Sequence, residues 1–316
     1  MDAVALAGSA PTTNRNVSIP AVLGGRYELE LLIGHGGNGQ VYRALDHSLR
    51  RHVAVKMLYD TEASAARFER EINQQTGLKH SSLIPLLDAG AHGGRRYLVM
   101  PLIQGTTLAD RIASGPLTGR ETRRIGAALA GALDYVHAHG IVHHDVKPSN
   151  VLLGRGRRVF LADFGIACRR GEPEPTATAH FPLTGTAAYL APEQVEHGTI
   201  GYAGDVYALG LVLLEALTGV HAYRGTALEQ ALARLWRQPQ IPASLGPRWS
   251  GLLTAMTARD PTRRPTTRHI TKTLRAVGSP PSSLPSHQWA HPLQRHCTAP
   301  PTRPARSSSS NAPHPS

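Results

Sequence analysis

The ten residues IVHHDVKPSN, at positions 141–150, combine several side chains that could do chemistry. Two histidines precede Asp145, a lysine follows it two positions later, and Asn150 follows it after five. Imidazole and carboxylate ligands suit zinc or iron, so a metal site is one interpretation. A polar surface turn is a second, and a catalytic Asp beside a metal-ligating Asn is a third. The choice among them depends on the rest of the chain.

A glycine-rich run, GHGGNG at 34–39, has the spacing G-x-G-x-x-G. The run alone is a weak signal, because plain hairpin turns and dinucleotide-binding loops share it. A dinucleotide loop joins a strand to a helix, whereas the strand-like residues Val41 and Tyr42 follow this run directly. A glycine loop that closes a β-hairpin can lie over a triphosphate and offer backbone N–H groups to it.

The next strand-like segment contains VAVK, which ends at Lys56. Alternation along a strand places Ala54 and Lys56 on one face, so the small alanine leaves room for a flat ring and the lysine could reach phosphates. The ammonium group would need a carboxylate to hold it. Glu71, in the helix predicted to follow, is the candidate, with Glu62 and Glu69 as rivals. An ordinary surface lysine is the alternative.

The tripeptide DFG begins at Asp163, thirteen residues after Asn150. Segments 150–153 and 158–165 have the character of short strands joined by a glycine-containing hairpin, which would bring Asn150 and Asp163 together. Two oxygen ligands, completed by phosphate oxygens and water, make a magnesium site. Zinc would require three or four protein ligands, so this pair favours magnesium.

Hydrophobic periodicity predicts the elements that must position these residues. Strands are predicted at 27–34, 40–46, 51–59 and 95–103, with a helix at 63–78 before the last of them. Further helices are predicted at 119–139, 205–218, 226–237, 248–258 and 266–276. A small β-rich part followed by a larger helical part predicts a ligand-binding cleft between the two.

The composition narrows the class of protein. The net charge is +12, but the arginines are scattered and aromatic residues make up only 5%, so nucleic-acid binding is not expected. Cys168 and Cys297 lie too far apart for a disulfide scaffold or a cysteine zinc site, which fits a reducing cytoplasm. The longest apolar stretch, 207–219, is too short to span a bilayer and contains Glu215, so no membrane span is expected.

A glycine loop, a strand lysine, a catalytic Asp and a metal-binding Asn and Asp are together the components of phosphoryl transfer. The motifs GHGGNGQV, VAVK, HHDVKPSN, DFG and APE (191–193) resemble the eukaryotic-like Ser/Thr protein kinases of bacteria, and the composition is similar to that of actinobacterial members. The resemblance covers about residues 27–277. It implies an α+β fold, the bilobal protein-kinase fold, with a small β-rich N-lobe and a larger α-helical C-lobe. The expected boundaries are a disordered tail at 1–24, a kinase domain at 25–277 (N-lobe 25–102, C-lobe 103–277) and a disordered Pro/Ser-rich tail at 278–316.

The resemblance implies ATP and Mg²⁺ as cofactors and a role for each residue that matches a motif. Asp145 would accept or orient the proton of the substrate hydroxyl, and Lys147 would neutralise the γ-phosphate. Asn150 and Asp163 would hold magnesium. The residues expected to bind ATP are Ile33, Gly34, His35, Gly36, Gly37, Asn38, Gly39, Gln40, Val41, Ala54, Lys56, Glu71, Met100, Leu102 and Leu152.

Within that set, the segment 33–41 would cover the phosphates, and Val41, Ala54 and Leu152 would sandwich the adenine. Glu71 would hold Lys56 against the α- and β-phosphates. Met100 would lie at the back of the pocket, next to an adenine-binding hinge at 101–103. Pro101 replaces the usual acidic residue of that hinge, but its carbonyl can still accept a hydrogen bond.

The same resemblance assigns residues 163–193 to an activation segment. Thr176 and Thr178 would be autophosphorylated, and Thr186 would bond Asp145 and Lys147. The resemblance also implies two structural roles: Glu193 would pair with Arg264, and Asp205 would brace the loop around Asp145.

The chain departs from the family at His144, where the usual residue is an arginine that pairs with a phosphothreonine of the activation segment. A histidine of ordinary pKa, about 6.5, is largely neutral at pH 7. We therefore expect a kinase whose basal activity depends only weakly on loop phosphorylation.

Three classes of function are compatible with these motifs. The first is an active Ser/Thr protein kinase that phosphorylates Ser/Thr residues of proteins, itself included, in bacterial signalling. The second is a pseudokinase or scaffold, which the presence of Lys56, Asp145, Asn150 and Asp163 disfavours. The third is a small-molecule phosphotransferase, which would not be expected to carry GTAAYLAPE. The first implies a cytoplasmic enzyme with protein substrates, and it allows a kinase-domain homodimer.

Overall fold

The computed structural model describes most of the chain between Val22 and Ala276. The described residues are 22–36, 39–59, 68–69, 72, 75–163, 168–169, 186–197 and 201–276. All of them fall within one compact unit, residues 1–282. The predicted helix at 63–78 lies largely outside the described residues.

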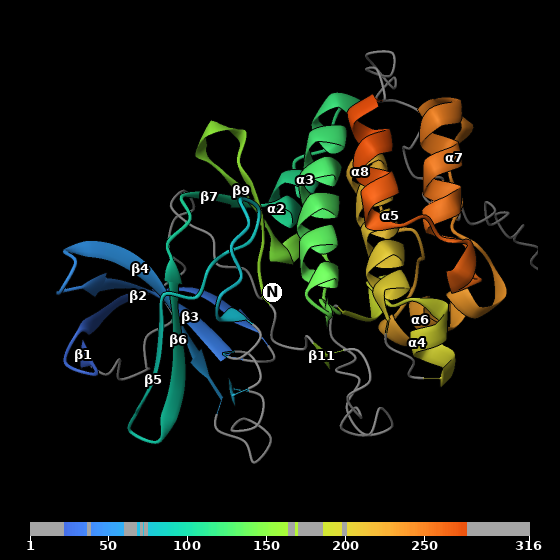
Figure 1. Ribbon diagram of the computed structural model, residues 1–316. Coiled ribbons are helices and arrows are strands. Elements are labelled where there is room, and N and C mark those ends of the chain that lie inside the picture. Colours follow the sequence, from blue (N-terminus) through green and yellow to red (C-terminus); the bar gives the residue numbers. More distant parts are fainter. Residues whose placement is uncertain are drawn as a thin grey trace, which may run out of the picture. The chain divides into compact units, whose positions relative to one another are not determined.

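The N-terminal part is one antiparallel sheet of six strands, in the order β1-β2-β3-β4-β6-β5 (Figure 1). Its strands are β1 (Val22–Leu23), β2 (Tyr27–Gly36), β3 (Gly39–Asp46), β4 (Arg51–Leu58), β5 (Asp88–His92) and β6 (Arg95–Pro101). The strands alternate buried and exposed side chains where one face of the sheet meets solvent, as in the first half of β2. One face of the sheet buries Tyr27, Tyr42, Val55 and Val99 in a common apolar cluster.

The first strand, β1, begins inside the segment predicted to be a disordered tail. Leu23 is completely buried and packs in the same cluster as Tyr27. Gly24 and Gly25 both have positive φ, at 55° and 67°, and turn the chain from β1 into β2. The prediction of disorder for residues 1–24 is therefore wrong at its last three positions, because a two-residue strand is too short to show a period.

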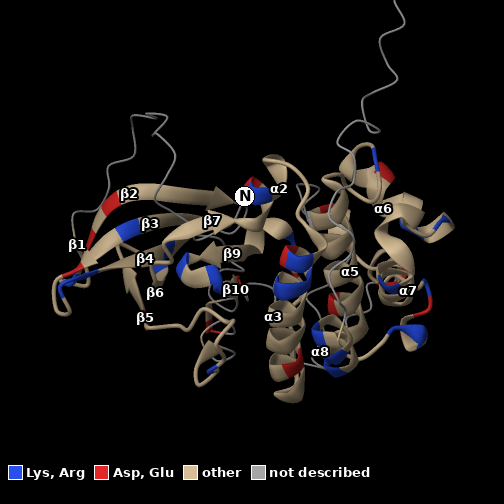
Figure 2. Cartoon of the chain, turned by 90° about the horizontal axis from the view of Figure 1, so that it is seen from above, with Lys and Arg blue, Asp and Glu red and all other residues tan. Residues whose placement is uncertain are grey.

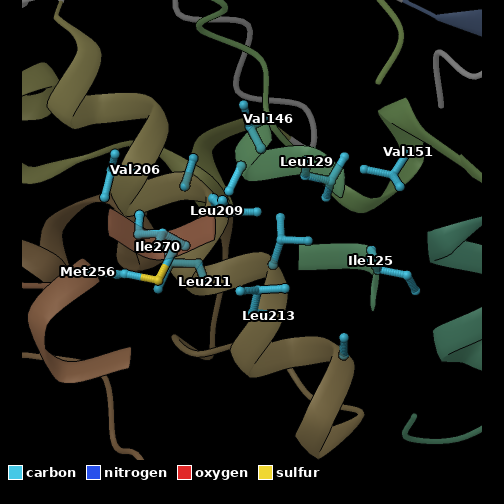
Figure 3. Packing of buried hydrophobic residues seen from close by; sticks show 14 of the residues in the cluster. Ile125, Leu129, Val146, Val151, Val206, Leu209, Leu211, Leu213, Met256 and Ile270 are labelled. Atoms are coloured by element: carbon cyan, nitrogen blue, oxygen red, sulfur yellow. The ribbon is translucent and has the colours of Figure 1, made fainter. Parts of the chain in front are cut away.

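The C-terminal part is mainly helical. Its helices are α2 (Leu108–Ala113), α3 (Gly119–Ala138), α4 (Pro192–His197), α5 (Tyr202–Thr218), α6 (Ala227–Trp236), α7 (Gly246–Met256) and α8 (Thr267–Ala276). Residues 204–217 of α5 are all buried, which is the pattern of a helix at the centre of a core. Figure 3 shows Leu209, Leu211 and Leu213 of α5 among side chains from α3, α7 and α8. The predicted α+β, bilobal fold is confirmed.

Short elements join the two parts. The described three-stranded sheet, in the order β10-β9-β7, contains β7 (Gly105–Thr107), β9 (Val151–Gly154) and β10 (Val159–Leu161). The 3-10 turn η2 (Arg155–Arg157) connects β9 to β10, and Gly156 in it has φ 66°. The predicted strand at 158–165 is shorter than expected, because the chain leaves it after Leu161. The remaining pair is β8 (Ile141–Val142) with β11 (Cys168–Arg169).

Charged residues are dispersed over the described elements. Figure 2 shows basic positions on strands of the N-lobe as well as on α3 and α8, with acidic positions interspersed. No helix among the described residues is both long enough and apolar enough to cross a membrane.

Candidate active site

Asp145 lies in the loop that follows β8, and its carboxylate is held from two sides. Lys147 Nζ lies 2.9 Å from Asp145 Oδ2. The 3-10 turn η1 (Pro148–Asn150) folds the chain back, so that Asn150 Nδ2 donates to the same oxygen at 2.8 Å and to the Asp145 carbonyl at 2.9 Å. All three residues are buried. The carboxylate is thus oriented by one cation and one amide.

Asp163 reaches the same place through the β9–β10 hairpin. Beyond β10, the backbone N–H of Ala162 donates to the Asn150 carbonyl at 2.8 Å, which fixes the spacing of the two segments. Lys56 Nζ, from β4 in the other lobe, lies 2.8 Å from Asp163 Oδ1. Asp163 has a φ of 62°, the left-handed region that non-glycine residues seldom occupy. Such a backbone conformation is often retained where it aims a functional side chain.

Two oxygens at this junction are buried without a hydrogen-bond partner among the described residues: Asn150 Oδ1 and Asp163 Oδ2. Burying an acceptor without a partner is costly, so each such oxygen needs an explanation. An amide oxygen and a carboxylate oxygen are ligands that Mg²⁺ accepts, usually together with water and phosphate oxygens. The residues present therefore fit the magnesium site that the sequence predicts.

The predicted adenine-binding residues form one apolar cluster. Val41, Ala54, Met100 and Leu152 are all buried and contact one another directly or through shared neighbours, although they come from both lobes. Ala54 lies opposite Met100 in the β4–β6 register. Ile33, Leu102 and Ile103 are partly buried against the cluster. This arrangement offers a flat apolar wall beside Lys56, as the alternation of VAVK predicts.

The glycine run closes the β2–β3 hairpin. Gly36 pairs with Gly39, and His35 pairs with Gln40. A Cβ at Gly39 would lie 2.2 Å from the Met57 carbonyl oxygen of β4, so this position has room only for glycine. The run therefore joins two strands, which excludes the strand-to-helix loop of a dinucleotide site. Gly37 and Asn38 lie outside the described residues.

No cluster of three or more metal-ligating side chains occurs among the described residues, and both ring nitrogens of His143 form hydrogen bonds. His143 Nδ1 accepts from the backbone N–H of Asp145 at 3.3 Å, so Nε2 carries the proton and donates to the Ala162 carbonyl at 3.1 Å. Complete burial lowers the pKa of His143 and favours this neutral ring. The metal interpretation of the HHD motif is therefore wrong, and His143 instead ties the Asp145 loop to the segment that carries Asp163.

Asp205, at the start of α5, braces the same loop, as predicted. Its carboxylate accepts the backbone N–H groups of His143 and His144 at 2.8 Å and 2.9 Å. It also lies 2.8 Å from His137 Nε2 of α3. Burial raises the pKa of Asp205, but the hydrogen bond with His137 and the electrostatic effect of the surrounding histidines together outweigh burial and hold the pKa of the carboxyl below its ordinary value.

His144 is largely buried in a small pocket beside Asp145 and Asp205. Its φ is 66°, and its Nε2 has no hydrogen-bond partner among the described residues. Burial lowers the pKa of His144 to about 4, although Asp205 pulls it in the opposite direction. The side chain that stands in place of the family's arginine is thus neutral at physiological pH.

Comparison with known proteins agrees with this geometry. The family model described as "Protein kinase domain" matches residues 27–274. The chain belongs to this family. It is 35% identical over 237 residues to serine/threonine-protein kinase PknB of Mycolicibacterium smegmatis, covering 72% of this chain and 38% of that protein. It is also 37% identical over 229 residues to serine/threonine-protein kinase PknD of Mycobacterium tuberculosis, covering 71% of this chain and 34% of that protein.

A third relative is a probable serine/threonine-protein kinase of Streptomyces coelicolor, 37% identical over 238 residues, with 72% of this chain and 35% of that protein covered. The kinase chain described here therefore matches only about a third of the length of each of these curated relatives.

The end of the predicted activation segment is anchored by the predicted ion pair. Arg264 binds Glu193 through two hydrogen bonds, of 2.6 Å and 2.7 Å, and also donates to the Ala203 carbonyl at 2.8 Å. The guanidinium lies over the Tyr207 ring, 4.9 Å from its centroid. Tyr189 adds a second anchor, because its hydroxyl donates to Glu215 Oε2 at 2.5 Å.

Several predicted residues of the kinase site cannot be placed. Glu71, Thr176 and Thr178 lie outside the described residues, as does the Thr186 side chain. The described carboxylate beside Lys56 is that of Asp163. Sequence reasoning also gave no role to Arg234 of α6, whose guanidinium donates to the backbone carbonyls of Ala188 and Leu190.

Proposed function

We propose that this chain is an ATP-dependent serine/threonine protein kinase that transfers the γ-phosphate of ATP to Ser/Thr hydroxyls of proteins, itself included, in bacterial signalling. The observation that carries the proposal is the Asp145 carboxylate, which Lys147 and Asn150 orient. Beside it lie two buried oxygens that have no hydrogen-bond partner in the described part of the chain. The names of the relatives, all serine/threonine kinases, support the same activity.

In the proposed reaction, the substrate hydroxyl oxygen bonds to the γ-phosphorus while the bond from that phosphorus to the β–γ bridging oxygen breaks. The hydroxyl proton passes to the Asp145 carboxylate, and ADP leaves. Lys147, 2.9 Å from Asp145, would stabilise the negative charge on the transferred group. Positioning and charge stabilisation account for most of the catalysis in this class of reaction.

The binding roles are proposals that rest on the same geometry. The 33–41 hairpin would cover the phosphates, and Lys56 would bind the α- and β-phosphates with Glu71 as its helix partner. The apolar cluster around Ala54 and Met100 would hold the adenine. Asn150 Oδ1 and Asp163 Oδ2 would hold Mg²⁺, which neutralises phosphate charge when bound.

Magnesium dependence gives a direct check of that assignment. The Asp163→Asn variant should weaken binding of Mg–ATP by at least about tenfold, while binding of ATP in EDTA changes little, because a neutral amide is a poorer Mg²⁺ ligand. Titration calorimetry with and without Mg²⁺ measures both. If ATP binding is weakened equally with and without Mg²⁺, Asp163 holds Lys56 and is not a Mg²⁺ ligand.

The kinase domain is proposed to occupy residues 25–277, extended at its start by β1, with the lobes meeting near 102–103. A cytoplasmic location follows from the ATP substrate and from the two widely separated cysteines. Autophosphorylation between molecules would require a transient kinase-domain homodimer.

The decisive experiment is transfer of labelled phosphate from ATP by the purified chain, compared with Asp145→Asn, which keeps the shape of the side chain and removes its charge. The wild type should label itself or a generic basic protein, and Asp145→Asn should lose at least about a hundredfold of that rate. A wild-type protein that binds Mg–ATP and labels neither acceptor would instead be a pseudokinase.

We further propose that the activity depends only weakly on phosphorylation of the activation segment. A neutral, largely buried His144 offers no permanent cation to a phosphothreonine. The double variant Thr176→Ala, Thr178→Ala should therefore keep most of the wild-type rate. A loss of about a hundredfold, the scale of removing an essential electrostatic contact, would contradict this proposal.

A further inference from the structure

Helix α6 contributes a buried arginine to the kinase core. Arg234 is 1% exposed, and its guanidinium donates three hydrogen bonds to backbone carbonyls. Nη1 donates to Leu190, Nη2 donates to Ala188 at 3.1 Å, and Nε donates to Gln230 within the helix at 3.0 Å. Of the first two acceptors, Ala188 lies in η3 (Thr186–Tyr189), and Leu190 lies between η3 and α4.

The two buried arginines of this region differ in whether a carboxylate neutralises their charge. Arg264 pairs with Glu193, whereas Arg234 pairs with no carboxylate in the described part of the chain. Burial accordingly lowers the pKa of Arg234, and the ring of Tyr223, 5.1 Å away, provides part of the compensation. A buried cation of this kind costs stability that an apolar side chain of similar volume would not. Stability alone therefore does not account for an arginine here.

The planar fork of the guanidinium does account for it. Two N–H groups of one rigid plane reach the carbonyls of Ala188 and Leu190 together and so fix the orientation of the backbone between them. Lysine carries a compact ammonium on a flexible stem and cannot impose that geometry. The guanidinium lies over the ring of Tyr223. That ring is itself held in place, since its hydroxyl bonds both Tyr207 at 2.9 Å and the Arg237 carbonyl at 3.2 Å.

The backbone that Arg234 fixes lies against the Asp145 loop. Asp145 and His144 line one small pocket together with Tyr189 and Leu190. A protein segment that presents a hydroxyl to Asp145 would therefore lie close to Tyr189 and Leu190. We propose that Arg234 is a positioning residue for the protein substrate: it holds the Ala188–Leu190 backbone where that segment must dock. This inference rests on the proposed kinase function and adds a determinant of protein-substrate binding on α6.

The test uses the full chain and two variants. Arg234→Met keeps the stem and removes the fork and the charge, and Arg234→Lys keeps the charge and removes the fork. Both should raise the KM for a generic basic protein substrate by at least about tenfold, because misplacement of a substrate costs at least that much. Affinity for Mg–ATP and the rate of phosphate transfer to water should stay within about twofold. Hydrogen exchange of the amides at 186–191 should become faster.

A matched control separates positioning from general loss of stability. Leu274→Ala, in α8, removes buried side-chain volume next to Gly126 of α3, without touching the Arg234 hydrogen bonds, and should lower the thermal midpoint. At a temperature where its folded fraction equals that of Arg234→Met, its protein-substrate KM should remain that of the wild type. An equal rise in the control would overturn the proposal, as would an Arg234→Lys variant with wild-type KM.

If Arg234→Met does not fold, the same measurements on Arg234→Lys alone test the positioning role of Arg234. Hydrogen exchange keeps the inference distinct from the proposed function. If the wild type phosphorylates no protein, the kinase function is refuted. Faster exchange at 186–191 in the Arg234 variants would still support the role of Arg234 in holding the Ala188–Leu190 backbone. Unchanged hydrogen exchange in that segment would overturn this role of Arg234, whether or not the chain phosphorylates protein.

Discussion

His144 should make the folded protein sensitive to mild acid. Burial lowers its pKa to about 4, and the carboxylates of Asp205 and Asp145, which raise the pKa, only partly offset that effect. In the unfolded chain the same imidazole has a pKa of about 6.5. Between these two values the unfolded state binds a proton that the folded state does not. The free energy of unfolding therefore rises with pH in this window and falls as pH decreases.

The size of the effect follows from the two pKa values. Lowering the pH from about 7.5 to about 5 should remove about 2 kcal/mol of stability through His144 alone, and about 3 kcal/mol is lost once the pH is below the folded pKa. His143, whose pKa is also lowered, changes stability in the same direction. The contribution of His144 is consequently measured as a difference between the wild type and a variant.

His144→Asn is the informative variant, because asparagine does not titrate and tolerates the left-handed backbone at this position. Urea denaturation followed by circular dichroism should show that the wild type loses about 2 kcal/mol more than His144→Asn between about pH 7.5 and pH 5. His92→Asn, at an exposed histidine of the β5–β6 hairpin, is the control and should follow the wild type. Equal losses in wild type and His144→Asn would refute the argument that burial keeps this ring neutral.

Three further predictions test the packing around the site. Glu193→Ala leaves the Arg264 guanidinium buried without its carboxylate and should lower the free energy of unfolding by about 3 kcal/mol in urea titrations; a loss under about 1 kcal/mol would show that the pair is not needed. Gly105→Ala places a Cβ 2.0 Å from a backbone carbonyl oxygen of β9 and should cost about 1–3 kcal/mol by the same method, whereas an unchanged midpoint would contradict the register of β7. Asn150→Asp keeps an oxygen ligand but sets a carboxylate against Asp145, so phosphate transfer should fall at least about a hundredfold while calorimetry still detects Mg–ATP binding; loss of that binding would contradict this division of roles.

The sequence predicts the long elements well because their periods are set by burial on one face. Strand β4 and helices α3 and α5 begin and end within a few residues of their predicted limits. The elements that it does not predict, such as β5, β7, α2 and α4, are short. Their conformations depend on tertiary contacts, as when β7 pairs with β9, which lies far along the chain, with Gly105 opposite Gly154.

Helix α6 shows why periodicity is not sufficient. A stripe at Leu228, Leu232 and Trp236 would be predicted to face the core, yet these side chains are 56%, 45% and 85% exposed. Arg234 is buried instead. The buried face of α6 is the one from which Arg234 donates to the carbonyls of Ala188 and Leu190, and hydrophobicity along α6 contains no signal of those acceptors.

The residues of the site could be predicted from motifs. The motifs do not predict which polar atom of each side chain forms a hydrogen bond and which is left without one. The amide nitrogen of Asn150 donates to Asp145, and its Oδ1 has no partner among the described residues. Asp163 likewise accepts from Lys56 through Oδ1, and its Oδ2 has no partner among the same residues. Each side chain therefore holds a neighbour with one atom and presents a buried oxygen with the other. Because the holding bonds fix the orientation of the presented oxygens, the Asp145 carboxylate and the proposed magnesium ligands are positioned by the same few contacts. A change at any one of them should alter both proton acceptance and metal binding unless, as in Asn150→Asp, the presented oxygen is conserved.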